Sequence, residues 1–411
     1  MNKVHAICLV VDGLRASALG AYGNTSYPTP QLDSLAGRSL LVDWLWADSP
    51  SLPHFYRSAW QGRHALRPDV GAPQLTQQLH NAGVRQWLVT DDPWLTEQSI
   101  ALPFAKTLLL ETSADQAAAS IEETQLAQMF SETILQIDEW RQRGDPDDAS
   151  LLWLHASGLM GPWDAPLALR EELLQEDDPA PLEFVNAPDA LRDLDDPDEI
   201  HAYRVAYAAQ MAVVDSCVGA FLSTISESFA DTETLVMLLS SSGYALGEHR
   251  CVGSGCWELF GERLHLPWLL HVCGNCQPLQ RHAALAQPTD VGVTLLDWFG
   301  QEFPAPVDGH SLLPLLAGQR CLERQIAVSC GHAGEQSIRT PAWHLRKPAA
   351  SDNGTASAEL YVKPDDLWEY NEVASRCPQV VDDLSSELEG IEACARNDQP
   401  LPTTPGNSEL P

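Results

Sequence analysis

The chain has 411 residues, of which 44% are hydrophobic and 20% are charged, and this composition excludes collagen-like and wholly disordered proteins. Its 57 acidic and 24 basic side chains give a formal net charge of −33, so its surface repels phosphate backbones and anionic lipid headgroups. We therefore expect neither nucleic acid nor a membrane as a partner, and the sequence does not identify a protein or small-molecule partner.

Short, uninterrupted apolar runs predict the strands of a sheet that is covered on both faces. These runs occupy residues 6–11, 86–89, 151–154, 235–239 and 268–272. Amphipathic stretches between them predict helices over residues 75–81, 121–141 and 202–226. The pattern predicts an α/β fold with a mostly parallel central sheet and helices on both faces.

The first apolar run stops at Asp12 and has no small-residue cleavage site after it. We interpret it as a strand and not as a signal peptide, and we expect the protein to be cytoplasmic. A reducing compartment would leave the ten cysteines as thiols. Cys251, Cys256, Cys273 and Cys276 are clustered, and their spacing resembles a zinc site, but idle or buried thiols are the favoured interpretation.

Two acidic segments interrupt or follow the pattern of strands and helices. Residues 164–200 contain proline and many carboxylates, which predicts a long surface loop with one short helix. Residues 380–411 are acidic and then rich in proline, so we expect a disordered tail that buries too little apolar surface to offset its ordering entropy.

In a parallel sheet, ligands bind at the carboxyl ends of the strands. The residues that follow the predicted strands are therefore the first candidates for a site. They are Asp12, the group 90–92, the group 155–157 and the group 240–242.

Several motifs resemble the sulfatases of the alkaline phosphatase superfamily. The opening reads VVDGLR at 10–15, LGAYG at 19–23 and TPQLDSLA at 29–36. Further matching motifs occur at 203–219, 246–249, 262–267, 289–297, 308–316, 338–343 and 359–361. The resemblance covers residues 4 to 379. It implies an alkaline-phosphatase-like α/β domain over 1–316 and a small C-terminal α+β subdomain over 317–379.

The resemblance places a metal-ligating carboxylate at Asp12, but its expected partners are replaced. Gly13 occupies the position of a frequent second aspartate, and the S-D-H-G or S-D-N-G motif has become serine at Ser241 and Ser242. One carboxylate with hydroxyls makes a weak calcium site, because affinity follows the charge of the ligands. We expect no bound cofactor, and Asp12 is either a vestigial ligand or a residue that caps the turn after the first strand.

The nucleophile segment of the family, C-x-P-x-R, also departs from its pattern here. Ser51 precedes Leu52 and Pro53, no cysteine is present, and the arginine, Arg57, comes two positions late. Ser51 is a candidate nucleophile if a metal or base activates it. The alternative is a serine of a loop or of a helix N-terminus.

The cationic and imidazole groups that the family places around its substrate are mostly absent. Asp91 and Pro93 stand where the resemblance implies lysine and histidine, Met160 replaces a second histidine, and Ser254 replaces a second lysine. His155 is retained. Losing one oxyanion-stabilising donor costs roughly 100- to 1000-fold in rate, so four losses predict no activity by the ancestral route.

Two hypotheses follow. The first is a sulfatase-like protein, by descent a sulfuric ester hydrolase, that has lost its metal site and nucleophile and acts in binding or assembly. The alternative is a divergent sulfate or phosphate ester hydrolase with calcium or magnesium as cofactor. It uses Ser51, Asp12 and His155, and Arg57, His54 and His249 are further candidates.

Overall fold

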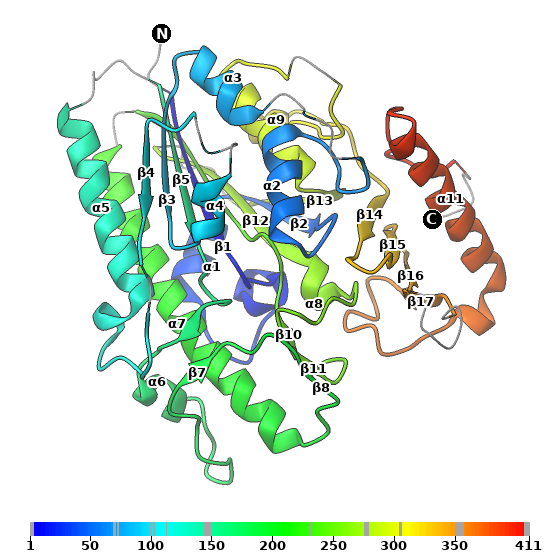
Figure 1. Cartoon of the computed structure of the whole chain (residues 1–411), viewed down its shortest axis with the longest axis horizontal. Helices are drawn as coiled ribbons and strands as arrows, with labels where there is room; N and C mark the ends of the chain where they lie inside the picture. The colour runs from blue at the N-terminus through cyan, green and yellow to red at the C-terminus, as the bar shows by residue number, and fades with distance from the viewer. Residues whose placement is uncertain are drawn as a thin grey trace. The chain divides into compact units, whose positions relative to one another are not determined.

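The computed structural model describes residues 4–68, 71, 74–98, 101, 103–111, 113–143, 149–229, 232–274, 279–303, 306–349 and 357–406 (Figure 1). The chain divides into two compact units, each built from separate segments. The first comprises Met1–Leu41, Leu79–Cys256 and Pro267–Gln280, and the second comprises Val42–Gln78, Trp257–Leu266 and Arg281–Pro411. This division differs from the predicted boundary at residue 316, because residues 42–78 pack with C-terminal segments that follow them by more than 200 positions.

The sheet of the first unit is mostly parallel, as predicted. Its strand order is β12-β9-β1-β5-β3-β4. β1 pairs in parallel with β5 and β9, β3 pairs in parallel with β4 and β5, and β12 is antiparallel to β9. The strands are β1 (Val4–Val11), β3 (Arg85–Thr90), β4 (Lys106–Leu109), β5 (Ser150–Ala156), β9 (Glu233–Leu239) and β12 (His265–Val272). Each predicted strand is confirmed, and every residue of β5 is buried, as its uninterrupted apolar pattern requires.

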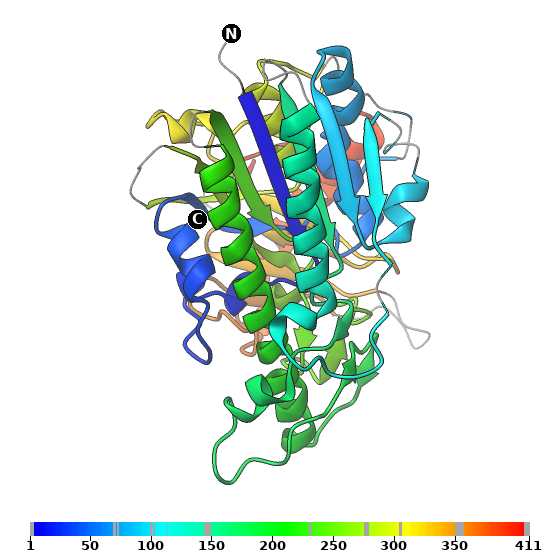
Figure 2. The same cartoon turned by 90° about the vertical axis from the view of Figure 1, so that its left-hand side faces the viewer.

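Two long helices lie side by side over one face of this sheet: α5 (Gln125–Arg143) and α7 (Pro197–Ser228) (Figure 2). Phe130 of α5 packs edge-on against Phe221 of α7, with 5.5 Å between the ring centroids. α7 is long and apolar enough to cross a membrane by length and composition, but 78% of its most apolar window is buried inside the protein. The helices α1 (Pro30–Ala36) and α4 (Pro93–Glu97) also belong to the first unit. The helix α3 (Leu75–Asn81) crosses the boundary, because Gln78 falls in the second unit and Leu79 in the first.

The acidic insertion 164–200 is more ordered than predicted. It contains the expected short helix, α6 (Leu167–Glu171), and two short strands, β7 (Val185–Asn186) and β8 (Leu191–Arg192). β7 pairs with β6 (Pro162–Trp163), and β8 pairs with β11 (Cys251–Gly253), which pairs with β10 (Ala245–Leu246). Arg170 is fully buried and donates to the carbonyl oxygens of Leu182 and Trp163, which holds the insertion against the core.

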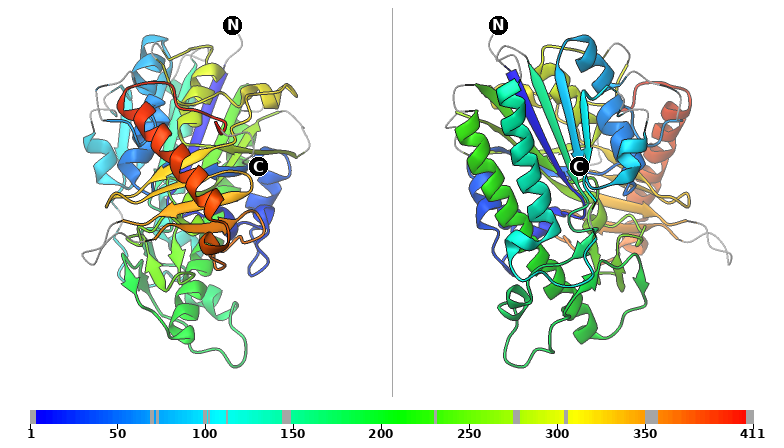
Figure 3. Two further views of the ribbon diagram at one scale, coloured as in Figure 1. Left: turned by 90° about the vertical axis from the view of Figure 1, so that its right-hand side faces the viewer. Right: turned by 60° about the vertical axis from the view of Figure 1, so that its left-hand side comes forward.

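The second unit contains an antiparallel sheet in the order β14-β15-β16-β17, crossed by the helix α11 (Pro378–Arg396), drawn in red in Figure 3. Its strands are β14 (Ala327–Cys330), β15 (Gln336–Arg339), β16 (Trp343–Lys347) and β17 (Glu359–Val362). The prediction of a disordered tail from residue 380 is therefore wrong over 380–396. Leu384, Leu388, Ile391 and Ala395 recur at helical spacing and are buried, and the first three join the core of this sheet.

The remaining elements of the second unit are β2 (Leu40–Trp46), α2 (Leu52–Gln61), α8 (Gly261–Leu264), β13 (Gln280–Ala286), α9 (Thr289–Trp298) and α10 (Leu313–Leu316). α2 packs against α9, and β2 is the neighbour of β13.

Candidate functional site

Asp12 lies at the carboxyl end of β1, where its backbone N–H donates to the carbonyl of Ala156 at 2.9 Å. β1, β5 and β9 are parallel neighbours, so the residues that end them meet at the same edge of the sheet. His155 of β5 and Ser241, just after β9, both contact Asp12. The structure therefore brings together three of the residues that the sequence singled out.

Both carboxylate oxygens of Asp12 are engaged by protein groups. The Ser241 hydroxyl donates to Oδ1, and Nε2 of His155 lies 3.3 Å from Oδ2. Asp12 is 7% exposed and His155 is fully buried. Burial by itself lowers the pKa of His155, but Asp12 and Asp91 outweigh it and the pKa is raised, which favours an imidazolium beside the Asp12 carboxylate.

The turn that follows Asp12 is closed by the loop after β5. Gly13 has a φ of +77°, and a Cβ built on it would lie 2.9 Å from Cβ and 3.0 Å from the carbonyl carbon of Leu159. The Leu159 N–H donates to the Asp12 carbonyl at 2.9 Å, and the Tyr207 hydroxyl donates to the Gly13 carbonyl at 2.8 Å. A second carboxylate at position 13 has no room in this arrangement.

Asp91 follows β3 and binds the loop after β5. Its Oδ1 accepts hydrogen bonds from the backbone N–H of Ser157 at 2.7 Å and from the Ser157 hydroxyl at 3.0 Å. Burial raises the pKa of Asp91, against the opposing effects of Ser157 and His155. The Ser157 contact was not predicted, although Ser157 belongs to the group 155–157 that follows a predicted strand.

A small cavity of about 20 Å³ lies beside Asp91 and is lined by Gln125, Leu126, Gly158, Gly161, Pro162, Asp164 and Gln210 as well as Asp91. This volume holds about one water molecule. A pocket for a drug-sized molecule has roughly 300–1,000 Å³, so this cavity does not admit a sugar sulfate or an aryl ester.

The donor set at Asp12 does not fit a hard divalent cation. Such an ion takes six or more oxygen ligands, several of them carboxylates. Here the Ser241 hydroxyl already donates its proton to the Asp12 carboxylate. The Ser242 carbonyl accepts a hydrogen bond from the Gly13 N–H at 3.1 Å. Over the residues that the structure describes, no group of three or more His, Cys, Asp or Glu side chains is arranged to hold a metal ion.

Ser51 and Arg57, the predicted nucleophile and its arginine, belong to the second unit. Ser51 is the residue before α2, and its carbonyl accepts from the Phe55 N–H at 2.9 Å, while its side chain makes no capping bond. Nη2 of Arg57 donates to the carbonyls of Ala65 at 2.5 Å and His64 at 3.2 Å. These bonds give Arg57 a structural role in the turn after α2. Nδ1 of the nearby His54 pairs with the Ser49 hydroxyl at 2.9 Å.

Arg15 and Glu248 form a contact that was not predicted from the sequence. Nη1 of Arg15 and Oε1 of Glu248 form a buried ion pair at 2.5 Å, and Oε2 of Glu248 accepts from the Leu246 N–H at 2.8 Å. Both residues belong to motifs that resemble the family, but 233 positions separate them, and sequence spacing alone cannot show that they meet.

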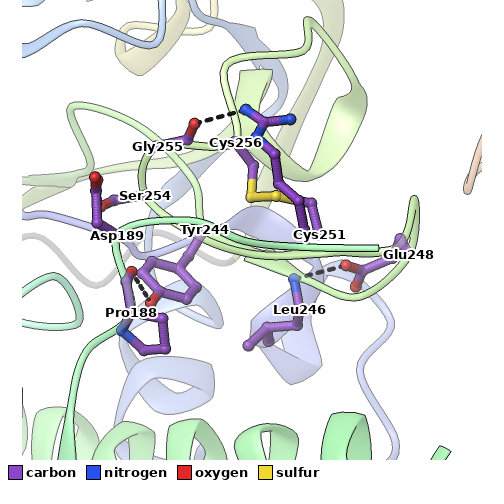
Figure 4. The surroundings of a disulfide bond; sticks show 10 residues. Pro188, Asp189, Tyr244, Leu246, Glu248, Cys251, Ser254, Gly255 and Cys256 are labelled. Carbon is purple, nitrogen blue, oxygen red and sulfur yellow. Dashed lines mark hydrogen bonds between the residues drawn. A yellow bond between two sulfur atoms is a disulfide. The ribbon is translucent and has the colours of Figure 1, made fainter. Parts of the chain in front are cut away.

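The interpretation of the clustered cysteines as thiols is wrong for Cys251 and Cys256, which form a disulfide bond (Figure 4). The chain turns back after β11 and brings the two Cα atoms to 6.1 Å, within the range that a disulfide requires. Cys273 is a buried free thiol, and Cys276 lies outside the described residues.

The disulfide closes the loop that carries Ser254, where the resemblance implies a lysine. The Gly255 N–H donates to the Asp189 carbonyl at 2.5 Å, and the Ser254 N–H donates to the Pro188 carbonyl at 3.3 Å. Nη2 of Arg192 donates to the Gly255 carbonyl at 3.1 Å (Figure 4). The insertion 164–200 thus binds this loop through backbone groups.

Comparison with known proteins identifies a family and a fold. A sequence model of the family described as Sulfatase matches residues 5–301. The multifunctional alkaline phosphatase superfamily protein PehA of Trinickia caryophylli is 31% identical over 123 residues, which are 30% of this chain and 24% of PehA. Arylsulfatase K of Xenopus laevis is 27% identical over 192 residues, which are 46% of this chain and 33% of that protein. The matches thus span about a quarter to a third of the length of these curated relatives.

Among solved structures, the phosphonate monoester hydrolase of Agrobacterium radiobacter superposes with a TM-score of 0.75 at 17% identity, covering 96% of each chain. At that identity the likeness shows the fold alone. The alkaline-phosphatase-like fold expected from the sequence is therefore confirmed over nearly the whole chain.

Proposed function

This chain belongs to the sulfatase family, and we propose that within it the protein is non-catalytic and serves in binding or assembly. The observation that carries the proposal is the state of Asp12. Its two carboxylate oxygens face the Ser241 hydroxyl and the His155 imidazole, where the family resemblance implies a divalent cation. The raised pKa of His155 favours a positive charge beside this carboxylate.

The charge distribution around Asp12 supports the same proposal. Sulfate and phosphate esters are anions, and their hydrolysis depends on fixed positive groups around the transferring oxyanion. Asp91 stands where the resemblance implies a lysine, and the contact of Gly13 with Leu159 opposes a second carboxylate at position 13. An anionic ester would meet the carboxylates of Asp12 and Asp91, both of which act on His155.

Catalytic turnover is the direct test. We expect hydrolysis of 4-nitrophenyl sulfate, 4-nitrophenyl phosphate and an aryl phosphonate monoester to stay at the rate of buffer, and Ser51→Ala to leave that rate unchanged. The phosphonate is included because a structural neighbour is a phosphonate monoester hydrolase. Turnover by the wild type that Ser51→Ala abolishes would overturn the proposal in favour of the serine hydrolase hypothesis. Turnover that survives Ser51→Ala would overturn both.

Metal binding is an independent test. A cation that binds the folded state stabilises it by about 2.7 kcal/mol at 100 times its dissociation constant. We expect 1 mM calcium or magnesium to change the melting temperature of the wild type and of Asp12→Asn equally. The variant is the necessary control, because a chain with a net charge of −33 attracts divalent cations non-specifically. A stabilisation that the wild type shows and Asp12→Asn lacks would contradict our reading of this donor set.

A further inference from the structure

Three large apolar side chains are exposed within four positions of the loop that follows β17. Leu367 is 39% exposed, Trp368 is 40% exposed and Tyr370 is 60% exposed. We call these three residues the aromatic loop surface. Single exposed apolar residues are ordinary, but several that lie close together in the sequence, with tryptophan and tyrosine among them, are typical of interaction sites.

The residue between the two aromatic side chains anchors the loop from inside. Glu369 is 2% exposed and has a φ of +57°, a left-handed conformation that a non-glycine residue adopts only when its surroundings fix it. Its carboxylate accepts from Nδ1 of His344 at 2.7 Å, from Nζ of Lys363 at 2.8 Å and from the Gly261 N–H at 2.8 Å. Glu369 thus points into the protein, while its two neighbours are 40% and 60% exposed.

A second set of bonds fixes the backbone of the same loop. Nζ of Lys363 donates to the carbonyls of Asp366 at 2.7 Å and Leu367 at 3.2 Å. The Asp366 carboxylate accepts from the backbone N–H groups of Tyr370 at 3.1 Å and Asn371 at 2.9 Å. The loop is therefore held in one shape before any partner arrives, which lowers the entropy lost on binding.

The chemistry of this surface favours a cation. The faces of tryptophan and tyrosine rings attract guanidinium and ammonium groups. The segment 363–376 carries four carboxylates and two basic side chains. Glu369 is buried against Lys363, whereas Asp365 and Glu372 are exposed, with Oε1 of Glu372 accepting from the N–H groups of Leu360 and Ala374. A second copy of this chain brings the same net charge of −33 and is repelled.

We propose that the aromatic loop surface binds an arginine- or lysine-bearing segment of another protein. The partner's cationic groups stack on Trp368 and Tyr370, their aliphatic stems cover Leu367, and Asp365 and Glu372 face the remaining charge. The proposal goes beyond the non-catalytic function proposed above and does not depend on it, because none of these residues belongs to the Asp12 cluster.

The test measures binding of a fluorescein-labelled peptide, five repeats of Arg-Gly, by fluorescence anisotropy. The proteins compared are the wild type, the double variant Trp368→Ala/Tyr370→Ala, and Leu135→Ala, which removes an equally exposed apolar side chain (61%) from α5. None of these substitutions alters the net charge, so non-specific attraction affects all three proteins equally. We expect the double variant to bind at least tenfold more weakly and Leu135→Ala to bind like the wild type.

Equal affinity of all three proteins would overturn the proposal and would leave only non-specific attraction. Binding of neutral maltoheptaose that the double variant abolishes, with unchanged peptide binding, would also overturn it and would assign the surface to carbohydrate. Melting temperatures check that the double variant folds, as exposed positions lead us to expect. The ester hydrolysis assays are run on the same three proteins. They test the proposed lack of catalysis independently of peptide binding, so either proposal can fail without the other.

Discussion

Replacing Glu369 by glutamine is expected to lower the free energy of unfolding by about 3–5 kcal/mol, the range found when one partner of a buried ion pair is removed. Glutamine keeps the size of the side chain but removes its charge. Lys363, which is 6% exposed, then stays buried without its carboxylate. Chemical denaturation of the wild type and the variant measures the difference.

Glu389→Gln is the matched control for this experiment. Glu389 lies on α11 and binds Nζ of Lys347 at 3.2 Å, but its side chain is 71% exposed. Exposed ion pairs contribute about 0–1 kcal/mol, so the control should barely change stability. If Glu369→Gln lost as little stability as Glu389→Gln, the contacts of Glu369 with His344 and Lys363 would not stabilise the unit.

The same variant is expected to change the dependence of stability on pH. Burial opposes ionisation of Glu369, but His344 and Lys363 outweigh it and hold its pKa well below the usual range. A carboxyl whose folded pKa is depressed contributes stability above its unfolded pKa of about 4.3, and this contribution is lost as the pH falls toward the folded pKa. Burial lowers the pKa of His344 to about 4, so His344 titrates in the same pH range and the comparison is made in a His344→Gln background. Below about pH 4.3, His344→Gln should lose stability more steeply than His344→Gln/Glu369→Gln.

Gly13→Ala is expected to destabilise the protein by about 3 kcal/mol, from two separate causes. The left-handed backbone costs a residue with a Cβ about 1–2 kcal/mol. The contact at 2.9 Å with Cβ of Leu159 adds an overpacking cost of about 1–3 kcal/mol. Thermal or denaturant unfolding measures the sum.

Gly23→Ala separates the two causes. Gly23 also has a left-handed backbone, with a φ of +100°, but a Cβ there would meet no atom within 4 Å. It should therefore show the backbone cost alone. If Gly13→Ala were no more destabilising than Gly23→Ala, the turn after Asp12 would have room for a side chain, and the steric argument against a second metal ligand would fail.

The sequence was sufficient to predict the position of those helices and strands whose apolar pattern is strong. Helix α3 begins and ends at the predicted residues, and β1, β5 and β9 extend the predicted runs by two or three residues. α11 was missed because the average composition of the tail is acidic. Its apolar side chains include Leu384, Leu388 and Ile391, and their spacing of three and four residues predicts a helix in spite of the acidic composition.

The site was predicted in its residues but not in its contacts. Parallel strands imply that Asp12, His155 and Ser241 share one edge, and they do. The hydrogen bonds among these residues depend on the conformation of the turns that follow the strands. One such turn contains Gly158, whose φ of +52° fixes the loop that carries Ser157 and Leu159. The disulfide was missed because a reducing cytoplasm was expected, and Cys251 and Cys256 were therefore predicted to be free thiols. Their loop geometry permits the bond.

The division of the second unit among three chain segments has a consequence for synthesis on the ribosome. Helix α2 emerges early and buries Phe55, Tyr56 and Trp60 in the folded protein, yet its partner α9 begins at residue 289. At about 5–20 residues per second, α2 waits for more than 10 s before α9 is made. During that interval α2 lacks the helix that packs against it, and exposed apolar surface of this kind is what chaperones bind. A chain that stops before α9 never makes this contact.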